Sequence, residues 1–307
     1  MKKVTLQVPA TSANCGPGFD SLGLALNFYN EVTYEILDRE GMELYVQGQG
    51  SDYLKPFGGN LAFRSFFTVW NELTKGQKIG LKVSMLNRIP LSRGLGSSSA
   101  CIVGGVLAAS ILSGANLSQE QLLHYANGLE GHPDNVAPAI FGNFTVSYLD
   151  AENKPHSLVV KPAKPLKFIA LVPEMQLSTE VARQAIPPSV PHKDAVFNAS
   201  RSALLVGAIL SGNYEYLTEA LEDKLHQPYR SHLIPGLDEI FDAARQAGAY
   251  NAIISGAGST IMAYASPEAD CGKIGSAMKK VLRVKNLNSA YHIFDLDKFG
   301  AKVLDKF

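Results

Sequence analysis

The sequence contains few cysteines and no closely spaced pair of them. Only three of its 307 residues are cysteine, and Cys15, Cys101 and Cys271 stand far apart. Disulfide frameworks and zinc ribbons need several cysteines at short, regular spacings. The sequence therefore indicates neither class of small, cross-linked domain.

An excess of either charge is absent as well. The chain has 28 Lys and Arg residues and 28 Asp and Glu residues, for a formal net charge of +0 at pH 7. Nucleic-acid-binding proteins usually carry a basic excess that neutralises phosphates. We therefore expect no nucleic-acid partner, and a local basic patch would be needed to support one.

The chain also lacks a long uninterrupted apolar run. Its longest segment without a charged residue extends from Gly94 to Gln119, and the apolar part, residues 101–112, is shorter than the ~20 residues of a membrane span. The apolar strand after Lys2 and Lys3 ends at Pro9, too early for a signal-peptide core. We expect a soluble, cytoplasmic chain with no membrane partner.

Hydrophobic periodicity predicts strands and helices in mixed order, which is typical of the α+β class. Strands are expected at residues 4–8, 32–36, 42–46, 79–85, 144–148, 168–172, 250–255, 260–265 and 290–296. Helices are expected at residues 60–73, 98–113, 118–130, 178–184, 194–210, 214–221, 237–247 and 269–282. Residues 38–41 are expected to form the turn between the second and third strands.

A change in composition marks a boundary near the middle of the chain. Residues 150–165 contain three prolines, three lysines and few bulky apolar groups, as in a domain boundary or an exposed hairpin. A chain of this length is also near the size at which a single core stops growing. We predict two domains, residues 1–160 and residues 161–307.

The most informative segment is residues 90–100, PLSRGLGSSSA, because it follows a predicted strand and opens a predicted helix. A helix N-terminus presents unpaired N–H groups and the positive end of its dipole, and it binds phosphate readily. Gly94 and Gly96 would let the backbone approach an anion closely. The segment lacks the Gly-Lys-Ser/Thr of a Walker A loop. A glycine-rich turn before a helix is the alternative interpretation.

Two further loops combine small residues with turn-forming ones. Residues 9–20, PATSANCGPGFD, follow the first strand, and residues 255–260, SGAGST, lie between two late strands. Taken alone, the first is explained equally well as a rigid surface turn in which Asp20 caps a helix. The second, taken alone, is better explained as a tight hairpin loop.

Taken together and in this order, the three segments resemble the signature motifs of the GHMP kinases. The resemblance covers essentially the whole chain. It implies an ATP-dependent enzyme with a ribosomal-protein-S5-like N-terminal domain, a ferredoxin-like C-terminal domain and ATP bound between them with Mg²⁺. Residues 8–26, 130–138, 178–183 and 226–235 are similar to the members that phosphorylate L-homoserine on its side-chain hydroxyl, a step toward threonine.

The resemblance also implies which residues contact the nucleotide. The implied ATP-binding segment comprises Pro90, Leu91, Ser92, Arg93, Gly94, Leu95, Gly96, Ser97, Ser98, Ser99 and Ala100. Ser98 and Glu130 would hold Mg²⁺, an ion that prefers hard oxygen ligands. Residues 56–61 would contribute to the adenine pocket through Asn60, which an N-cap role explains equally well. Glu130 is otherwise a solvated charge at a helix end.

For the acceptor, the resemblance implies a site built around its carboxylate and ammonium groups. Arg183 and Arg230 would clamp the carboxylate, because a guanidinium matches it with two parallel hydrogen bonds. Asp20 would pair with the ammonium. The remaining site residues are Asn14 and His132, which would orient the other polar atoms, and Asp134 and Asn135, which occupy the position of the base in related kinases. Phosphoryl transfer needs little activation of the nucleophile, so proton abstraction by Asp134 is not part of the prediction.

Several alternatives remain open at this point. The nearest is another GHMP kinase that acts on a different alcohol. A nicotinamide-dependent oxidoreductase would need an acidic residue about twenty positions after the glycines, where residues 115–117 are Ala, Asn and Leu. An RNA-binding module and a catalytically silent relative are the other two. A homodimer is expected by family analogy alone.

Overall fold

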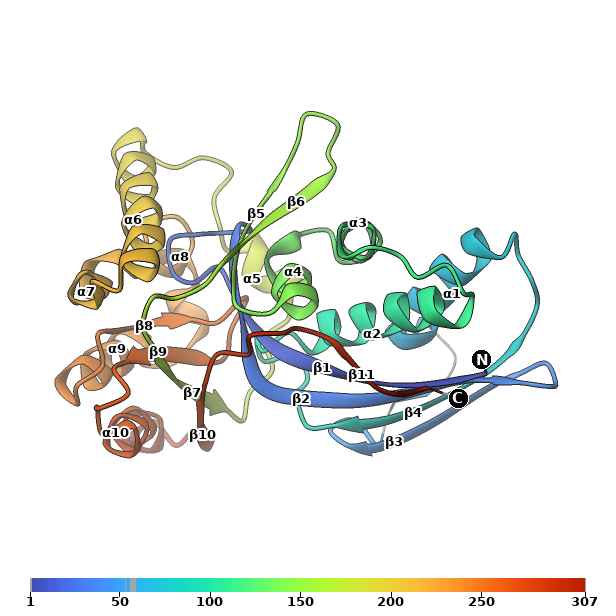
Figure 1. Ribbon diagram of the computed structural model, residues 1–307. Coiled ribbons are helices and arrows are strands. Elements are labelled where there is room, and N and C mark those ends of the chain that lie inside the picture. Colours follow the sequence, from blue (N-terminus) through green and yellow to red (C-terminus); the bar gives the residue numbers. More distant parts are fainter. Residues whose placement is uncertain (1, 53, 56–58, 307) are drawn as a thin grey trace.

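The computed structural model describes residues 2–52, 54–55 and 59–306, and it contains two sheets that are covered by helices (Figure 1). A seven-stranded sheet forms the first half of the molecule, and a four-stranded sheet forms the second. The expected α+β class with two domains is confirmed. The described part of the chain has no helix with the length and apolar character of a transmembrane segment.

The first sheet combines antiparallel and parallel pairs. Its strands are β1 (Lys3–Ala13), β2 (Leu22–Leu37), β3 (Met42–Gly48), β4 (Gly80–Asn87), β5 (Phe144–Leu149), β6 (Pro155–Val160) and β11 (Lys302–Lys306). The main order is β11-β1-β2-β4-β3, and β5 joins the other end of β2 and pairs with β6. The segment between residues 150 and 165 is thus partly the second strand of a hairpin, as one of the two interpretations expected.

The neighbours of β3 differ from what the turn at residues 38–41 suggests. This turn does connect β2 to β3, but β4 lies between the two strands in the sheet. β3 pairs with β4 in parallel, with Leu44 opposite Val83, and β4 pairs with β2 in antiparallel, with Val83 opposite Tyr34. Alternation of apolar residues identifies the buried face of a strand, but it does not identify the strand beside it.

Four helices pack on this sheet: α1 (Leu61–Leu73), α2 (Ser97–Leu112), α3 (Gln119–Glu130) and α4 (Pro133–Phe141). Asn60 caps α1 by accepting a hydrogen bond from the Ala62 N–H at 3.0 Å. Ser118 and Gln121 form the expected capping box of α3. α4 was not expected, although Pro133 at its first turn is a common start for a helix.

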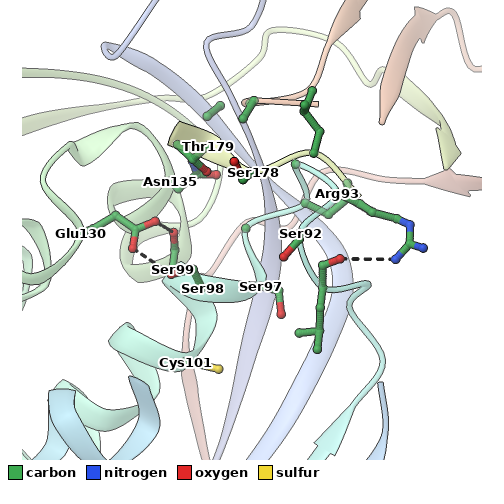
Figure 2. Close-up of a pocket in the computed structure, with 18 of the residues that line it drawn as sticks. Ser92, Arg93, Ser97, Ser98, Ser99, Cys101, Glu130, Asn135, Ser178 and Thr179 are labelled. Atoms are coloured by element: carbon green, nitrogen blue, oxygen red, sulfur yellow. Dashed lines mark hydrogen bonds between the residues drawn. The ribbon is translucent and has the colours of Figure 1, made fainter. Parts of the chain in front are cut away.

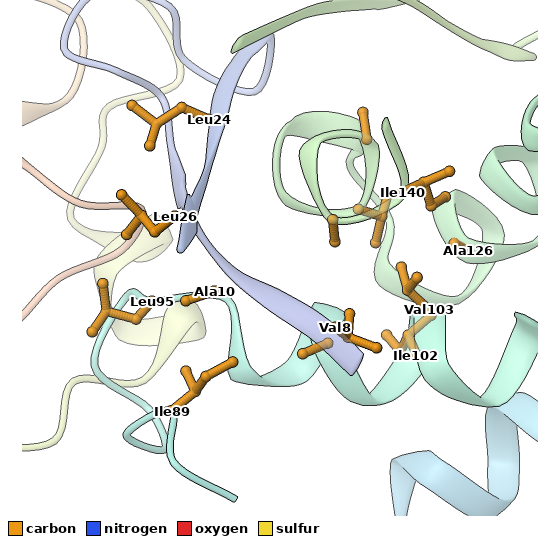
Figure 3. Close-up of a cluster of buried hydrophobic side chains, with 14 of the residues drawn as sticks. Val8, Ala10, Leu24, Leu26, Ile89, Leu95, Ile102, Val103, Ala126 and Ile140 are labelled. Carbon is orange, nitrogen blue, oxygen red and sulfur yellow. The ribbon is translucent and has the colours of Figure 1, made fainter. Parts of the chain in front are cut away.

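The core of this half holds the glycine-rich segment in place. Leu95 lies in the middle of that segment and is 1 % exposed. Figure 3 shows its side chain in the same region of the buried cluster as those of Leu26 and Ile89, while Val8 and Ile102 lie further along β1 and α2. The buried side chain of Leu95 therefore anchors the glycine-rich segment on the core.

The second sheet is antiparallel throughout and has the order β10-β7-β9-β8. Its strands are β7 (Lys167–Pro173), β8 (Asn251–Ile254), β9 (Ile261–Ala265) and β10 (Ser289–Phe294). Its helices are α5 (Thr179–Gln184), α6 (His192–Ser211), α7 (Leu217–Ala220), α8 (Gln227–Arg230), α9 (Leu237–Gln246) and α10 (Cys271–Val284). Helices α9 and α10 contribute Ile240, Ile274 and Met278 to a separate hydrophobic cluster under this sheet.

The end of the chain returns to the first sheet. β11 was not expected, and it pairs with β1 so that Val4 lies opposite Lys306. The first sheet therefore contains strands from both ends of the sequence, as the blue and red strands of Figure 1 show. The division into residues 1–160 and 161–307 stays a prediction.

Close packing of α1 on α2 leads to a prediction for Gly105. A Cβ atom at Gly105 would lie 2.0 Å from the Ser65 hydroxyl and 2.9 Å from the Phe66 backbone nitrogen. Gly105→Ala should therefore lower the free energy of unfolding by about 1–3 kcal/mol. Gly128 of α3 is the control, because a Cβ atom there has no neighbour within 4 Å.

Gly128→Ala should raise the free energy of unfolding by about 0.5–1 kcal/mol, since it replaces a helical glycine without strain. Urea denaturation of both variants gives the comparison. Equal changes of the same sign in the free energy of unfolding of the two variants would show that α1 and α2 do not approach as closely as described.

Candidate functional site

A cavity of about 630 Å³ lies where loops from both halves of the molecule meet. It is lined by residues of the β1–β2 loop, the glycine-rich segment, the α3–α4 junction, the start of α5, Arg230 and the loop before β9 (Figure 2). All three sequence segments that suggested a function contribute to this lining. The structure therefore brings together residues as far apart in the sequence as Ala13 and Gly258.

The N-terminus of α2 opens into this cavity. The N-cap is Gly96 in the left-handed conformation, with φ of 69°, and no side chain of the described residues caps the helix. Among these residues the buried Ser97 hydroxyl also has no hydrogen-bond partner. The first-turn amides of residues 97–99 are the ones that a helix leaves without an internal acceptor. This end of α2 is therefore suited to bind an anion.

Both glycines of the segment are required by close contacts. A Cβ atom at Gly96 would lie 1.9 Å from the Thr11 hydroxyl, and one at Gly94 would lie 2.1 Å from the Ser255 carbonyl oxygen. Thr11 also donates its backbone N–H to the Leu95 carbonyl at 3.2 Å. The glycine-rich segment is thus held between β1 and the loop at residues 255–260.

The loop at residues 255–260 has a supporting role. The Ser255 hydroxyl donates to the Gly94 carbonyl at 2.6 Å and also lies 2.8 Å from the Ser12 hydroxyl. The Thr260 N–H donates to the Arg93 carbonyl at 3.1 Å. These bonds connect the second sheet to the glycine-rich segment of the first domain, which explains why the motif lies so late in the chain.

Glu130, at the C-terminus of α3, faces the start of α2. Its two carboxylate oxygens accept hydrogen bonds from Ser98 at 3.1 Å and Ser99 at 2.8 Å, and Figure 2 shows both hydroxyls directed at the carboxylate. Glu130 is therefore hydrogen-bonded to two of the serines that open α2. The Ser98 and Glu130 oxygens are close enough to belong to one coordination sphere, and hydroxyl and carboxylate oxygens are hard ligands that suit Mg²⁺.

A second cluster of potential metal ligands consists of Asp20, His132 and Asp134, with ligand atoms within 4.8 Å of one another. Each of these three side chains already has a hydrogen-bond partner in this structure, however. Asp20 binds the guanidinium of Arg183, and Asp134 binds His132. His132 would also offer a nitrogen ligand, whereas Ser98 and Glu130 offer only hard oxygen ligands, which suit a magnesium ion better.

His132 is the N-cap residue of α4. Its Nδ1 atom lies 2.7 Å from an Asp134 carboxylate oxygen. Burial disfavours the imidazolium, but the hydrogen bond to Asp134 and the charges of Asp134 and Glu130 outweigh burial and raise the pKa of His132. Asp134 is 2 % exposed, and the neighbouring Asn135 accepts a hydrogen bond from the Thr11 hydroxyl at 2.7 Å. Both side chains are thus held in fixed orientations.

Asp20 and Arg183, which also line the cavity, form a two-pronged ion pair. The Arg183 guanidinium donates to the two Asp20 carboxylate oxygens at 3.0 and 2.6 Å. This hydrogen bonding raises the pKa of Arg183 despite its partial burial. The two residues predicted to bind opposite charges of a ligand therefore bind each other in this structure.

Arg230 is buried deeper, at 2 % exposure. Its Nε atom donates to the Ala182 carbonyl at 2.9 Å, and its Nη1 atom donates to the Gly256 carbonyl at 3.1 Å. Burial and the neighbouring charge of Arg183 lower the pKa of Arg230 to about 10, so the side chain keeps its charge at neutral pH. A buried cation at a cavity wall favours an anionic ligand.

Two predicted ligand residues make bonds that are structural. Asn14 donates to the Gly256 carbonyl at 2.9 Å and accepts from the Asp20 N–H at 3.0 Å, so its amide holds Asp20 in place. Arg93 donates to the Pro173 carbonyl at 2.9 Å and to the Leu91 carbonyl at 3.3 Å. Both side chains line the cavity while satisfying backbone groups.

Most of the remaining predicted residues also line the cavity. Asn60 lines it while serving as the α1 N-cap and donating to the Lys55 carbonyl at 3.0 Å. Residues 56–58, expected in the adenine pocket, lie outside the described residues. Leu91, Ser92 and residues 94–99 line the cavity, whereas Pro90 and Ala100 are not among its lining residues.

Sequence reasoning did not predict several lining residues. These are Leu54, Lys55, Met85, Asn87, Leu177 and Thr179. Met85 and Asn87 lie two positions apart on one face of β4. The alternation of that strand marked Met85 as a core residue, and alternation does not distinguish a core face from a cavity wall.

Comparison with known proteins gives two family matches. The model of the GHMP kinases N terminal domain matches residues 60–143, and the model of the GHMP kinases C terminal domain matches residues 204–284. Together these ranges contain α1 to α4 of the first domain and α7 to α10 of the second.

Similar proteins of known name extend over nearly the whole chain. A homoserine kinase of Caldanaerobacter subterraneus subsp. tengcongensis is 41% identical over 98% of this chain and 95% of its own length. A homoserine kinase of Clostridium beijerinckii is 40% identical over 98% and 99%. The crystal structure of homoserine kinase from Cytophaga hutchinsonii superposes with a TM-score of 0.89 at 29% identity, covering 99% of this chain and 98% of that one. The chain therefore belongs to the GHMP kinase family and groups there with the homoserine kinases.

Proposed function

We propose that this protein transfers the γ-phosphoryl group of ATP to the side-chain hydroxyl of L-homoserine and forms O-phospho-L-homoserine. The observation that carries the proposal is that one cavity is lined both by an uncapped helix N-terminus and by Asp20, Arg183 and Arg230. The first feature suits a triphosphate, and the second suits the ammonium and carboxylate of an amino acid. Similarity to homoserine kinases at about 40% identity supports the same substrate.

At the nucleotide side, the first-turn amides of α2 would bind the β- and γ-phosphates. ATP carries about four negative charges at neutral pH, and this chain has no Walker lysine to neutralise them. Ser98 and Glu130 would hold Mg²⁺, which when bound neutralises phosphate charge during transfer. Ser99 would keep the Glu130 carboxylate oriented through its 2.8 Å hydrogen bond.

At the acceptor side, the substrate would exchange its own charges for those of the Asp20–Arg183 pair. The ammonium group would replace Arg183 as the partner of Asp20. The carboxylate would then bind the freed guanidinium of Arg183 together with Arg230. Because each charge finds a new partner, no charge is left unpaired in the bound state.

Around the reacting hydroxyl, the protein's contribution would be orientation. The fixed side chains of Asp134 and Asn135 line the cavity between the helix N-terminus and the acceptor pair. Phosphoryl transfer is accelerated mainly by alignment of the attacking oxygen with the phosphorus atom and by stabilisation of the phosphate charge. We therefore assign these residues and His132 to the acceptor site without a general base.

Assembly and location belong to the same proposal. We propose a homodimer, by analogy with the family, and a cytoplasmic location, which the balanced charge and unpaired cysteines of the sequence support. Light scattering of the purified protein tests the proposed homodimer. A mass corresponding to one chain, 33.1 kDa, would contradict it.

A substrate panel tests the reaction itself. We expect Mg²⁺-dependent release of ADP with L-homoserine, at a kcat/KM more than about 100-fold above that for mevalonate or a sugar, because a sugar has no charged group and mevalonate has no ammonium group to exchange with the Asp20–Arg183 pair. A coupled assay of ADP release, with and without magnesium, makes the measurement. Absence of a preference for the amino acid would contradict the proposed substrate, and failure of ATP to raise the melting temperature would contradict the kinase class.

Removal of the Glu130 carboxylate tests the metal site. Glu130→Gln should lower kcat by about 100-fold or more at saturating substrates, because the metal's charge stabilises the transition state. Ser99→Ala is the comparison, since it removes one bond to Glu130 and leaves both proposed ligands; it should lower kcat by less than about 10-fold. Equal rates for Glu130→Gln and the unmodified enzyme would exclude this residue as a ligand.

Neutralisation of Asp20 tests the acceptor site. Asp20→Asn should raise the KM for homoserine about 10- to 100-fold and leave the KM for ATP unchanged, because it weakens a charged hydrogen bond to the ammonium group. Glu222→Gln is the control, since Glu222 forms an ion pair with Arg201 at the surface. Steady-state kinetics over both substrates distinguish the two variants. A parallel rise in both KM values would point to distortion of the cavity.

A further inference from the structure

His226 is a buried titratable group that the proposed mechanism does not use. It precedes α8, is 0 % exposed, and is not among the residues that line the cavity. Its imidazole lies between two groups of different origin. Nε2 is 2.8 Å from the Gly16 carbonyl of the β1–β2 loop, and Nδ1 is 3.2 Å from Nη1 of Arg230.

These two partners determine the protonation state of the ring. A carbonyl oxygen can only accept, so Nε2 must carry the proton that it donates to Gly16. A guanidinium can only donate, so Nδ1 must be unprotonated to accept from Arg230. Only the neutral Nε2–H tautomer satisfies both bonds. Burial acts in the same direction, because it lowers the pKa of His226.

Neighbouring groups hold the imidazole in this position. The Asp223 carboxylate accepts the backbone N–H groups of His226 and Gln227 at 2.9 and 2.6 Å, which fixes the start of α8. The Phe19 ring lies 5.3 Å from the imidazole, centroid to centroid, and the Arg230 guanidinium carbon lies 5.3 Å from the centre of the same ring. The ring therefore has little freedom to rotate away from Arg230.

The bond from Arg230 to His226 completes the orientation of the guanidinium. Nε is directed to Ala182, and Nη1 is shared between Gly256 and His226. With Nε and Nη1 engaged in the plane of the group, the direction of Nη2 is determined. Arg230 lines the cavity, so this geometry fixes the orientation in which the guanidinium would meet an anion.

We propose that His226 is a positioning residue for the acceptor's carboxylate, acting through Arg230. The inference rests on the proposed function, since it assigns the carboxylate of homoserine to Arg230. The imidazole also connects Arg230 to the loop that carries Asp20, the proposed partner of the ammonium group. A single buried ring thus sets the separation between the two charge-recognising groups.

Two conservative variants separate the two bonds of the imidazole. His226→Asn keeps an amide oxygen near the position of Nδ1 and can still accept from Arg230. His226→Gln places its amide nitrogen near the position of Nε2 and can still donate to Gly16, but it lacks the acceptor toward Arg230. The control is Asn198→Ala, which removes the 2.7 Å bond from Asn198 to the Pro17 carbonyl of the same loop without touching Arg230.

We expect His226→Gln to raise the KM for homoserine about 10- to 100-fold, with the KM for ATP and kcat at saturation within about threefold of the unmodified enzyme. His226→Asn should retain a KM for homoserine near the original value, and Asn198→Ala should not reproduce the effect. In the background of Arg230→Lys, His226→Gln should cause no further loss of kcat/KM, because the two residues act as a unit.

The alternative outcomes are distinct. A larger loss in His226→Asn than in His226→Gln would assign the role to anchoring of the loop and overturn the inference. Additive losses of kcat/KM when His226→Gln is combined with Arg230→Lys would also overturn the inference. So would an equal rise in the KM values for homoserine and ATP in His226→Gln. The melting temperatures of all variants identify a folding defect. If the unmodified enzyme does not phosphorylate homoserine, the proposed function itself fails, which is measured before any variant is made.

Discussion

The structure depends on one helix end that has no internal cap. At the N-terminus of α2 the amides of residues 97–99 face a cavity, and no described side chain satisfies them. Such an end is stable only when the backbone before it is held rigidly, and here Leu95 is buried in the core while Thr11 and Ser255 bind the segment from two sides. A preorganised set of donors costs no reorganisation when an anion binds. Both domains are needed to produce it.

The charged residues of the cavity lining differ from this helix end, since their charges are satisfied before a ligand arrives. Asp20 pairs with Arg183, and Asp134 pairs with His132, because unpaired charges are costly in a partly buried cavity. A zwitterionic acceptor can exchange partners with the first of these pairs without leaving a charge alone. In the proposed mechanism, this exchange distinguishes homoserine from a neutral sugar, and it gives the orientation of Arg230 a direct role in binding the carboxylate.

Local patterns predicted most of the secondary structure. The caps of α1 and α3 were visible as Asn60 and as Ser118 with Gln121, because capping involves residues only two or three positions apart. The insertion of β4 between β2 and β3 and the return of β11 to β1 were not predicted. Strand pairing is non-local, and a short exposed strand such as β11 has a weak hydrophobic pattern. α4 also escaped detection, since its nine residues follow α3 almost directly.

The sequence by itself determined the chemical inventory of the site: the glycines and serines that open α2, and the carboxylates and guanidiniums of the acceptor side. Only the tertiary structure decided the pairing of these groups. It placed Asn14 and Arg93 on backbone carbonyls, Arg183 on Asp20, and His226 behind Arg230. The physical reason is that hydrogen bonds and ion pairs are short-ranged and directional. The hydrogen-bond partners Asn14 and Gly256 lie 242 positions apart in the chain. Residue type therefore limits which groups can pair, and the fold determines which of them come within hydrogen-bonding distance.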